Sequence, residues 1–296
     1  MSFLSTLISG ISLGSMYALI ALGYTMVYGI AKMLNFAHGE VIMIGGIATY
    51  EILAVMGMNA YVAIAVAVVV CTVLGVVVEK IAYKPLRKAG SLAVLITAIG
   101  VSYFLQNIAL LTFGSAYKSY TIQELKFSWD ITPDFSIQGT TIINIVLTVV
   151  IMVALTLFIR FTKTGRSMLA VSEDRDAAQL MGINVNGVIS VTFAIGSALA
   201  GVAGFLFLGT YGQIGAYSGT MPGIKAFTAA VFGGIGSIPG AMLGGIVLGI
   251  IEQFSKSILS EFQLSSFSDA VVFIVLIAVL LIKPTGILGK KVTEKV

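Results

Sequence analysis

The chain has 296 residues, 58% of them hydrophobic and only 10% charged, and its mean hydropathy is +1.04. A soluble domain is usually about 25% charged, so this composition excludes a soluble globular protein. The net charge of +4 and the pI of 9.1 do not indicate a nucleic-acid partner, because the basic residues lie beside apolar segments, as in the cytoplasmic loops of membrane proteins.

Eight apolar segments follow one another, most of them near the roughly 20 residues that cross a hydrocarbon core. They are continuous runs without the alternation of a membrane β-barrel. We therefore expect an all-α polytopic membrane bundle, a single domain over residues 1–296. The first segment lacks a basic start and is too long for a signal peptide, so it should be an uncleaved span. The segments are residues 4–30, 33–57, 60–80, 92–114, 141–160, 188–210, 223–252 and 268–283.

The second segment, residues 33–57, is interrupted near its start by the polar sequence NFAHGE. Ionisable residues inside a membrane are candidates for function, so this break could line a transport path. Equally, its polar residues could cap a helix and pack. His38 is the only histidine, and Cys71, the only cysteine, should pack in the core, so no metal site or nucleophilic triad is expected. The candidate path residues here are Asn35, His38, Glu40, Gly45 and Gly46.

Basic residues form three clusters, which hold twelve of the 17 lysines and arginines and should all face the cytoplasm. Residues 115–140 should face outside, either as an interfacial connector anchored by aromatic residues or as a contact for an external partner. The clusters are Lys80, Lys84, Arg87 and Lys88; Arg160, Lys163, Arg166 and Arg175; and Lys283, Lys290, Lys291 and Lys295.

Eight simple crossings cannot place all three clusters on one side. The conflict disappears if residues 223–252 enter the membrane and return to the same side, which a glycine-rich break near their middle would allow. Residues 33–57 would repeat this plan, and Lys-Pro pairs 199 positions apart, at Lys84 and Lys283, indicate a parallel internal repeat. Both termini are then cytoplasmic. The candidate path residues of this second break are Gly233, Gly234, Gly236 and Gly240.

Residues 252–267 are polar on one face and carry an apolar residue every four positions, at Phe254, Ile258 and Phe262. This spacing favours a helix lying in the membrane interface. Such a helix could be a surface anchor or a gate at the outer mouth.

The charged loop 160–187 is the most informative stretch. From Ser172 it reads SEDRDAAQLMG, which predicts a short helix with Ser172 as N-cap, acids in its first turns and Gly182 at its end. The chain has no GxxxxGK[ST] loop, and its near-GxGxxG at Gly234 follows no strand, so we expect no ATP hydrolysis, no enzyme activity and no cofactor. The absence of a chain of buried acids argues against an ion-driven transporter. The residues expected to receive force from a partner are Ser172, Glu173, Asp174, Asp176, Ala177, Ala178, Gln179 and Gly182.

This loop resembles the cytoplasmic coupling loop of ABC-importer permeases. Its core, Asp176-Ala177-Ala178-x-x-x-Gly182, is similar to their EAA motif, with Asp in place of Glu. Two further stretches, SLGSMYALIALGYTMVYGIAKMLNFAHGEVIMIGG and FGGIGSIPGAMLGGIVLG, resemble the branched-chain amino acid permease subfamily, and the likeness runs over nearly the whole chain.

The resemblance implies a multi-pass permease of the bacterial inner membrane. It implies a second homologous permease subunit, two ATPase subunits bound at the coupling helices, and an external substrate-binding protein. The expected substrate is leucine, isoleucine or valine, carried by alternating access, although relatives move urea, amides or other amino acids. An autonomous channel or facilitator is the competing class, but it would need no such mechanical loop. A membrane scaffold is disfavoured, because helix breaks are costly without a cavity to line.

Overall fold

The computed structural model of the chain describes residues 3–87, 89–132 and 135–289. Eight helices in these residues are long and apolar enough to cross a membrane, which confirms the predicted all-α bundle. Four of the basic residues predicted to face the cytoplasm lie outside the described residues: Lys88, Lys290, Lys291 and Lys295. The long helices are α1 (Phe3–Ala31), α2 (His38–Tyr50, continued to Val55), α3 (Ala60–Val78, continued to Leu86), α4 (Ser91–Phe113), α5 (Gly139–Phe161), α8 (Val185–Tyr211), α10 (Ile238–Ser260) and α11 (Ser268–Ile282).

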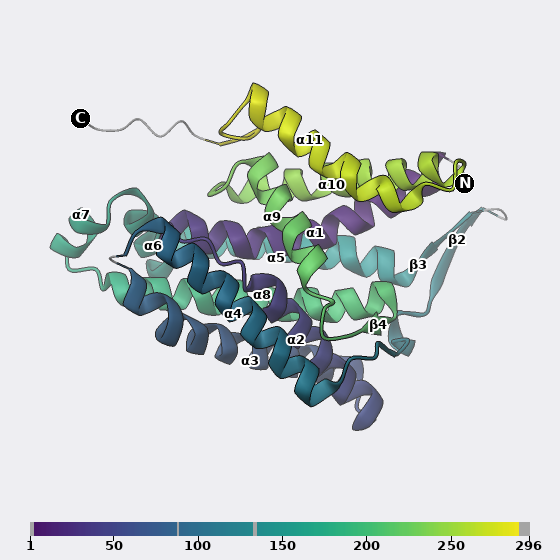
Figure 1. Cartoon of the computed structure of the whole chain (residues 1–296), viewed down its shortest axis with the longest axis horizontal. Helices are drawn as coiled ribbons and strands as arrows, with labels where there is room; N and C mark the ends of the chain where they lie inside the picture. The colour runs from purple at the N-terminus through teal and green to yellow at the C-terminus, as the bar shows by residue number, and fades with distance from the viewer. Residues whose placement is uncertain (1–2, 88, 133–134, 290–296) are drawn as a thin grey trace.

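Shorter elements mark the two ends of this bundle (Figure 1). The helices α6 (Lys163–Glu173) and α7 (Arg175–Leu180) lie at one end, which we call the coupling end. The hairpin of β2 (Ser128–Thr132) and β3 (Phe135–Gln138) projects from the other, which we call the hairpin end. At that end β1 (Lys118–Ser119) pairs antiparallel with β4 (Gln213–Ile214). Residues 115–132 and 135–140 therefore lie at the opposite end of the bundle from the charged loop, as predicted.

The described chain begins and ends at opposite ends of the bundle (Figure 1). Phe3 starts α1 at the hairpin end, where its ring lies 5.3 Å from that of Phe254. The stretch after α11 packs at the coupling end, where Ile287 donates its amide to the Phe232 carbonyl at 2.9 Å. The prediction that both termini share one side is therefore wrong. Its error lies in the second apolar segment, which crosses the bundle instead of returning to its side of entry.

That second segment begins with the non-helical residues 32–37, which run back into the bundle beside α1. Helix α2 starts at His38, whose Nε2 lies 2.3 Å from where a β-carbon on Gly23 would stand. From there the helix runs to the hairpin end without a break, and both Gly45 and Gly46 lie inside it. The predicted break therefore lies before the helix, and no re-entrant turn exists within residues 38–55.

The break predicted in residues 223–252 is confirmed. Helix α9 (Thr220–Gly233) ends there, α10 begins at Ile238, and Gly234 and Gly236 adopt left-handed φ angles of 106° and 95°. A β-carbon on Gly236 would contact Gly29 near the coupling end of α1, at 3.7 Å from its α-carbon. The turn thus reaches the coupling end, and α10 returns the chain to the hairpin end.

The two halves of the bundle run in opposite directions. Helices α8, α9, α10 and α11 begin 177–182 positions after α1, α2, α3 and α4, respectively. In each half a long first helix is followed by non-helical chain and by a shorter helix that begins inside the bundle. The single additional crossing by α5 reverses the second half, so the repeat is inverted and the prediction of a parallel one is wrong. Lys84 and Lys283 end non-equivalent helices, α3 and α11.

Residues 252–260 belong to α10 and cross the bundle with it. The prediction of a separate interfacial helix over residues 252–267 is therefore wrong. Apolar residues four positions apart, such as Phe254 and Ile258, also lie on one face of a helix that crosses the bundle. The spacing alone therefore does not distinguish an interfacial helix from a crossing one.

Helix α1 packs against α10 through small residues, and this contact gives a prediction. A β-carbon on Gly249 would lie 2.2 Å from the Gly14 α-carbon, so Gly249→Ala should lower the free energy of unfolding by about 1–3 kcal/mol. Gly100→Ala in α4 is the matched control, because nothing lies within 4 Å of its β-carbon. Unfolding of both purified variants in detergent measures the difference, and equal stability of the two would contradict this packing.

Candidate functional site

The charged loop folds into two helices instead of one. Asp174 separates them and caps α7, because its carboxylate accepts the amides of Asp176 and Ala177 at 2.9 and 3.0 Å. Ser172 lies in the last turn of α6 and donates to the Leu169 carbonyl at 2.7 Å, so its prediction as N-cap is wrong. A carboxylate that accepts two amides at the positive end of a helix is the better cap. Gly182 ends the helix as predicted, with a φ of 80°.

Two exposed apolar residues, Leu180 and Met181, lie at the C-terminal end of α7. Ala178 is buried, whereas Leu180 and Met181 are 88% and 82% exposed. Most of the other predicted contact residues are also exposed, in the last residue of α6, in the cap of α7 and on α7 itself: Glu173, Asp174, Asp176, Ala177 and Gln179. Exposed apolar side chains on a polar, protruding helix are typical of a surface that a partner covers.

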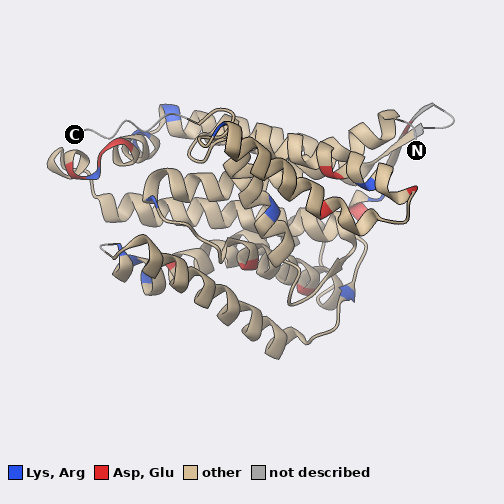
Figure 2. Cartoon of the chain, turned by 45° about the horizontal axis from the view of Figure 1, so that its top comes forward, with Lys and Arg blue, Asp and Glu red and all other residues tan. Residues whose placement is uncertain are grey.

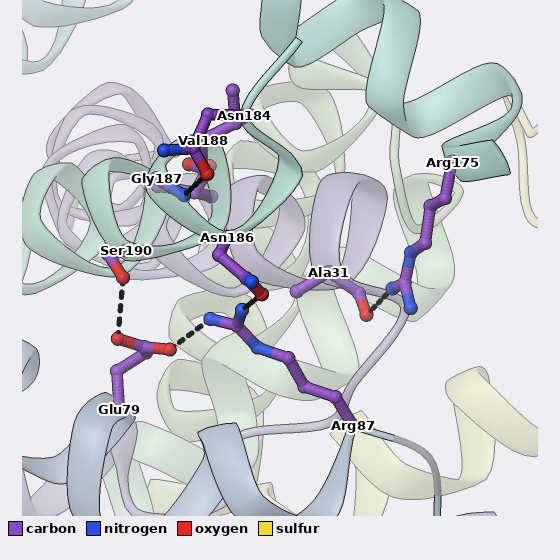
Figure 3. Close-up of polar contacts among 10 residues, drawn as sticks. Ala31, Glu79, Arg87, Arg175, Asn184, Asn186, Gly187, Val188 and Ser190 are labelled. Atoms are coloured by element: carbon purple, nitrogen blue, oxygen red, sulfur yellow. Dashed lines mark hydrogen bonds and ion pairs between the residues drawn. The ribbon is translucent and has the colours of Figure 1, made fainter. Parts of the chain in front are cut away.

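Two arginines join helices at the coupling end (Figure 3). The Arg175 guanidinium donates to the carbonyl of Ala31, the last residue of α1. Arg87, at the end of α3, donates to the Glu79 carboxylate and to the Asn186 side chain of α8. Burial and the neighbouring Arg87 lower the pKa of Arg175 below its usual range. The sequence placed Arg175 among the orienting basic residues, but the structure makes it a link between α7 and the end of α1.

The N-termini of α2 and α9 meet inside the bundle. A β-carbon on Gly39 would lie 2.6 Å from the Gly219 carbonyl oxygen, so the backbones of these two segments are in contact. Here the buried Glu40 carboxylate accepts hydrogen bonds from Gln106 at 2.7 Å and from Thr220 at 3.2 Å. A carboxylate between two positive helix ends is electrostatically favourable. We call this contact the Glu40 junction; it joins the two inverted halves.

The remaining candidate path residues make packing contacts. The Asn35 side chain accepts the Tyr83 hydroxyl at 2.8 Å, and the His38 ring lies 4.7 Å from that of Tyr24. The glycines of both breaks stand where helices or turns approach too closely for a side chain or where φ is left-handed: Gly45, Gly46, Gly233, Gly234, Gly236 and Gly240. None of the predicted path residues is among those that line the cavity of about 920 Å³ described next.

That cavity opens toward the hairpin end, and its floor carries charges that the sequence analysis missed. Lys225 of α9 pairs with Glu252 of α10 at 2.9 Å and with Asp269 of α11 at 2.7 Å. Lys256 pairs with Glu252 at 2.5 Å, and the Tyr17 hydroxyl donates to the same carboxylate at 2.8 Å. We call Lys225, Lys256, Glu252 and Asp269 the charged floor. Charged residues are otherwise sparse along the bundle (Figure 2). A lone lysine in an apolar segment was the available signal.

Comparisons with known proteins agree over nearly the whole chain. Residues 6–280 match the family described as branched-chain amino acid transport system / permease component. The high-affinity branched-chain amino acid transport system permease protein LivH of Escherichia coli is 47% identical over 99% of this chain and 98% of its own length. BraD of Pseudomonas aeruginosa, of the same description, is 45% identical over the same shares.

More distant matches complete the comparison. A probable LivH of Methanocaldococcus jannaschii is 29% identical over 93% of this chain and 89% of its own length. The solved structure of PsaBC from Streptococcus pneumoniae in complex with Fab is 14% identical, covers 95% of this chain and 91% of that one, and has a TM-score of 0.46. The match over residues 6–280 and the near full-length identity to LivH and BraD show that the chain belongs to the branched-chain amino acid transport permease family.

Proposed function

We propose that this chain is the permease subunit of an ABC importer that carries leucine, isoleucine or valine across the bacterial inner membrane. The observation that carries the proposal is the 47% identity to LivH over 99% of the chain. In this proposal the chain works with a second homologous permease, two ATPase subunits and an external binding protein. Its sequence has no GxxxxGK[ST] loop, so in this proposal the partners supply the hydrolysis.

The proposed coupling runs from α7 into the bundle. ATP-driven closure of the ATPase pair moves the exposed Leu180 and Met181, and Arg175 passes this motion to the end of α1. Helix α1 contacts His38 through Gly23 and Tyr24, and His38 directly precedes Gly39 of the Glu40 junction, so movement of α1 can open the junction. The predicted path residues around the two breaks then border the route between the junction and the coupling end.

The coupling end should face the cytoplasm, because it carries Arg160, Lys163 and Arg166. The N-terminus is then outside and the C-terminal stretch inside. A membrane-impermeant maleimide applied to intact cells should label Ser128→Cys, at the hairpin end, and spare Gln179→Cys. The opposite labelling pattern would invert the proposed orientation.

Substrate-stimulated ATPase activity of the reconstituted complex tests the proposed substrate. With its binding protein present, the complex should respond to leucine, isoleucine or valine and should fail to respond to urea. If urea alone stimulates the ATPase activity, the substrate is an amide, which is the alternative assignment, and not a branched-chain amino acid. Transport by the isolated chain without ATPases would instead indicate a facilitator.

Cross-linking tests the coupling surface. Gln179 is exposed whereas Ala178 is buried, so Gln179→Cys should cross-link to a cysteine on the ATPase subunit in a transport-active complex. Ser128→Cys, equally exposed at the other end, is the matched control and should give no product. Equal yields from both positions, or none from Gln179→Cys, would contradict the proposed docking.

Arg175→Ala should uncouple ATP hydrolysis from transport. The substitution removes the bond to the Ala31 carbonyl but leaves the exposed face of α7, so the ATPase should still bind. A charged hydrogen bond contributes about 1.5–3 kcal/mol, so transport per ATP hydrolysed should fall roughly tenfold. Arg175→Lys, which keeps the charge and one donor, should recover part of it. Unchanged coupling in Arg175→Ala would exclude this link.

A further inference from the structure

We infer that the charged floor of the hairpin-end cavity binds the α-ammonium and α-carboxylate groups of an amino-acid substrate. This inference rests on the proposed import function and assigns it a recognition site on this chain. The site comprises Lys225, Lys256 and Asp269, which line the cavity of about 920 Å³, and the fully buried Glu252 behind them, which pairs with both lysines.

The position of these charges argues for function. They lie beside the middle of α1, where the Lys225 Nζ is 6.0 Å from the centre of the Tyr17 ring. The Glu252 side chain is fully buried, and that of Lys225 is only 9% exposed. Charged residues within a membrane bundle are costly, and well-packed apolar residues usually replace a buried ion pair without loss of stability. Packing alone therefore gives no reason to keep two lysines and two carboxylates at this depth.

The charges are also arranged so that a ligand can reach them. The side chains of Asp269 and Lys256 are 34% and 38% exposed and lie on the cavity wall, whereas their partners are buried behind them. An incoming carboxylate can accept from Lys225 or Lys256, and an incoming ammonium can donate to Asp269. Each charge then exchanges one partner for another, so no buried charge is left unpaired during binding.

A zwitterion matches this floor better than a neutral or singly charged ligand does. The ion-paired groups of the floor are two positive and two negative charges, so a ligand with one of each keeps their sum at zero. Glu261 also lines the cavity, but it is exposed to water and forms no ion pair among the described residues. A singly charged ligand would leave one buried charge without compensation. Urea and other amides have no formal charges to exchange with the ion pairs, so the chemistry of the floor favours an amino acid over them.

Apolar side chains of the same cavity suit a hydrophobic substrate. Phe207 of α8 and Met221 and Pro222 of α9 line it together with Tyr17. A branched aliphatic side chain would be removed from water against these residues, at about 25 cal/mol for each Å² of apolar surface buried. The cavity wall thus combines a charged floor with an apolar side, as an aliphatic amino acid requires.

The site is connected to the Glu40 junction through α9. Met221 and Pro222 follow directly after Thr220, and Lys225 comes five positions after it in the same helix. The Thr220 hydroxyl donates to Glu40 at 3.2 Å. A ligand that rearranges the ion pairs of Lys225 therefore acts on the helix whose first residue closes the junction. Short helices that begin inside the bundle are where transporters of inverted-repeat architecture commonly bind substrate.

Protection of an engineered cysteine tests the inference on the complete permease–ATPase complex in nanodiscs. Ser266 is exposed and lines the cavity, so Ser266→Cys should react with a thiosulfonate reagent. Leucine at about ten times its Kd should slow this labelling roughly tenfold, because about nine tenths of the sites are occupied. Leucine should not protect Ser128→Cys on the hairpin. Isoamylamine and 4-methylpentanoate, which lack one charge each, should protect neither position.

Asp269→Asn in the Ser266→Cys background decides the role of the charged floor. It should raise the leucine concentration needed for half protection at least about tenfold, which corresponds to the loss of one charged contact. Asp130→Asn is the control, because Asp130 is an exposed carboxylate on β2 that does not line the cavity and forms no ion pair among the described residues.

The possible outcomes distinguish a failure of the proposed site from a failure of the proposed function. If the complex imports leucine but leucine does not slow the labelling of Ser266→Cys, the site is wrong and the import function stands. If protection is unchanged by Asp269→Asn, the charged floor is a structural ion-pair cluster and the inference fails. If urea stimulates the ATPases and leucine does not, the proposed function itself fails.

Discussion

Replacing Leu180 and Met181 together with aspartate should abolish stable association of the ATPase subunits with this permease. These side chains are 88% and 82% exposed on α7, beyond the buried Ala178. Apolar anchors at the centre of an interface typically contribute about 2 kcal/mol or more each, so the Kd should rise by at least about 30-fold for each substitution. Co-purification and titration of ATPase into nanodisc-embedded permease measure the effect.

The matched control for this prediction is Trp129→Asp. Trp129 is 68% exposed on β2, so the variant makes the same kind of change at the opposite end of the bundle. Its affinity for the ATPase should equal that of the unchanged chain. If both variants weaken association equally, the effect is a general loss of folding, and if neither does, α7 is not the docking helix.

Glu252→Ala should produce the largest loss of stability. The substitution removes the carboxylate that accepts from Lys225, Lys256 and Tyr17, and it leaves the buried Lys225 ammonium with the partly exposed Asp269 only. Breaking a buried ion pair costs about 3–5 kcal/mol, so the midpoint of unfolding in detergent should shift accordingly.

Two comparisons make this prediction specific. Glu261→Ala removes an exposed carboxylate that lines the same cavity and should change the free energy of unfolding by no more than about 0.5 kcal/mol. Lys225→Met combined with Glu252→Gln should recover part of the lost stability, because no buried charge is then left unpaired. A cost of Glu252→Ala no greater than that of Glu261→Ala would show that solvent already screens this pair.

Local patterns predicted what depends on neighbours in sequence. Hydropathy located the crossing helices, and the glycine-rich run located the turn between α9 and α10, because glycine permits the left-handed φ angles of Gly234 and Gly236. The same approach predicted one helix in the charged loop, where the structure has α6 and α7, and it chose the wrong cap. Ser172 and Asp174 are both good capping residues, and sequence alone does not show which of them the preceding helix will include.

The candidate site could be predicted only in part for a related reason. Asn35, His38 and Glu40 were recognised as polar residues in an apolar segment, but their partners were not. Glu40 meets Thr220 across 180 positions, and Tyr17 meets Glu252 across 235. Such pairs form when helices from different halves of the chain pack together, so a hydropathy pattern does not predict them.

The sequence by itself determined the membrane bundle, the crossing segments, the second break and the position of the charged loop, because each depends on composition or on contacts within a few residues. Only the tertiary structure decided the direction of each half, the start of α2 inside the bundle, the Glu40 junction and the charged floor. The physical reason is that one additional crossing by α5 inverts everything after it. This inversion brings the N-terminus of α9 against that of α2, a contact that no local property of either segment encodes.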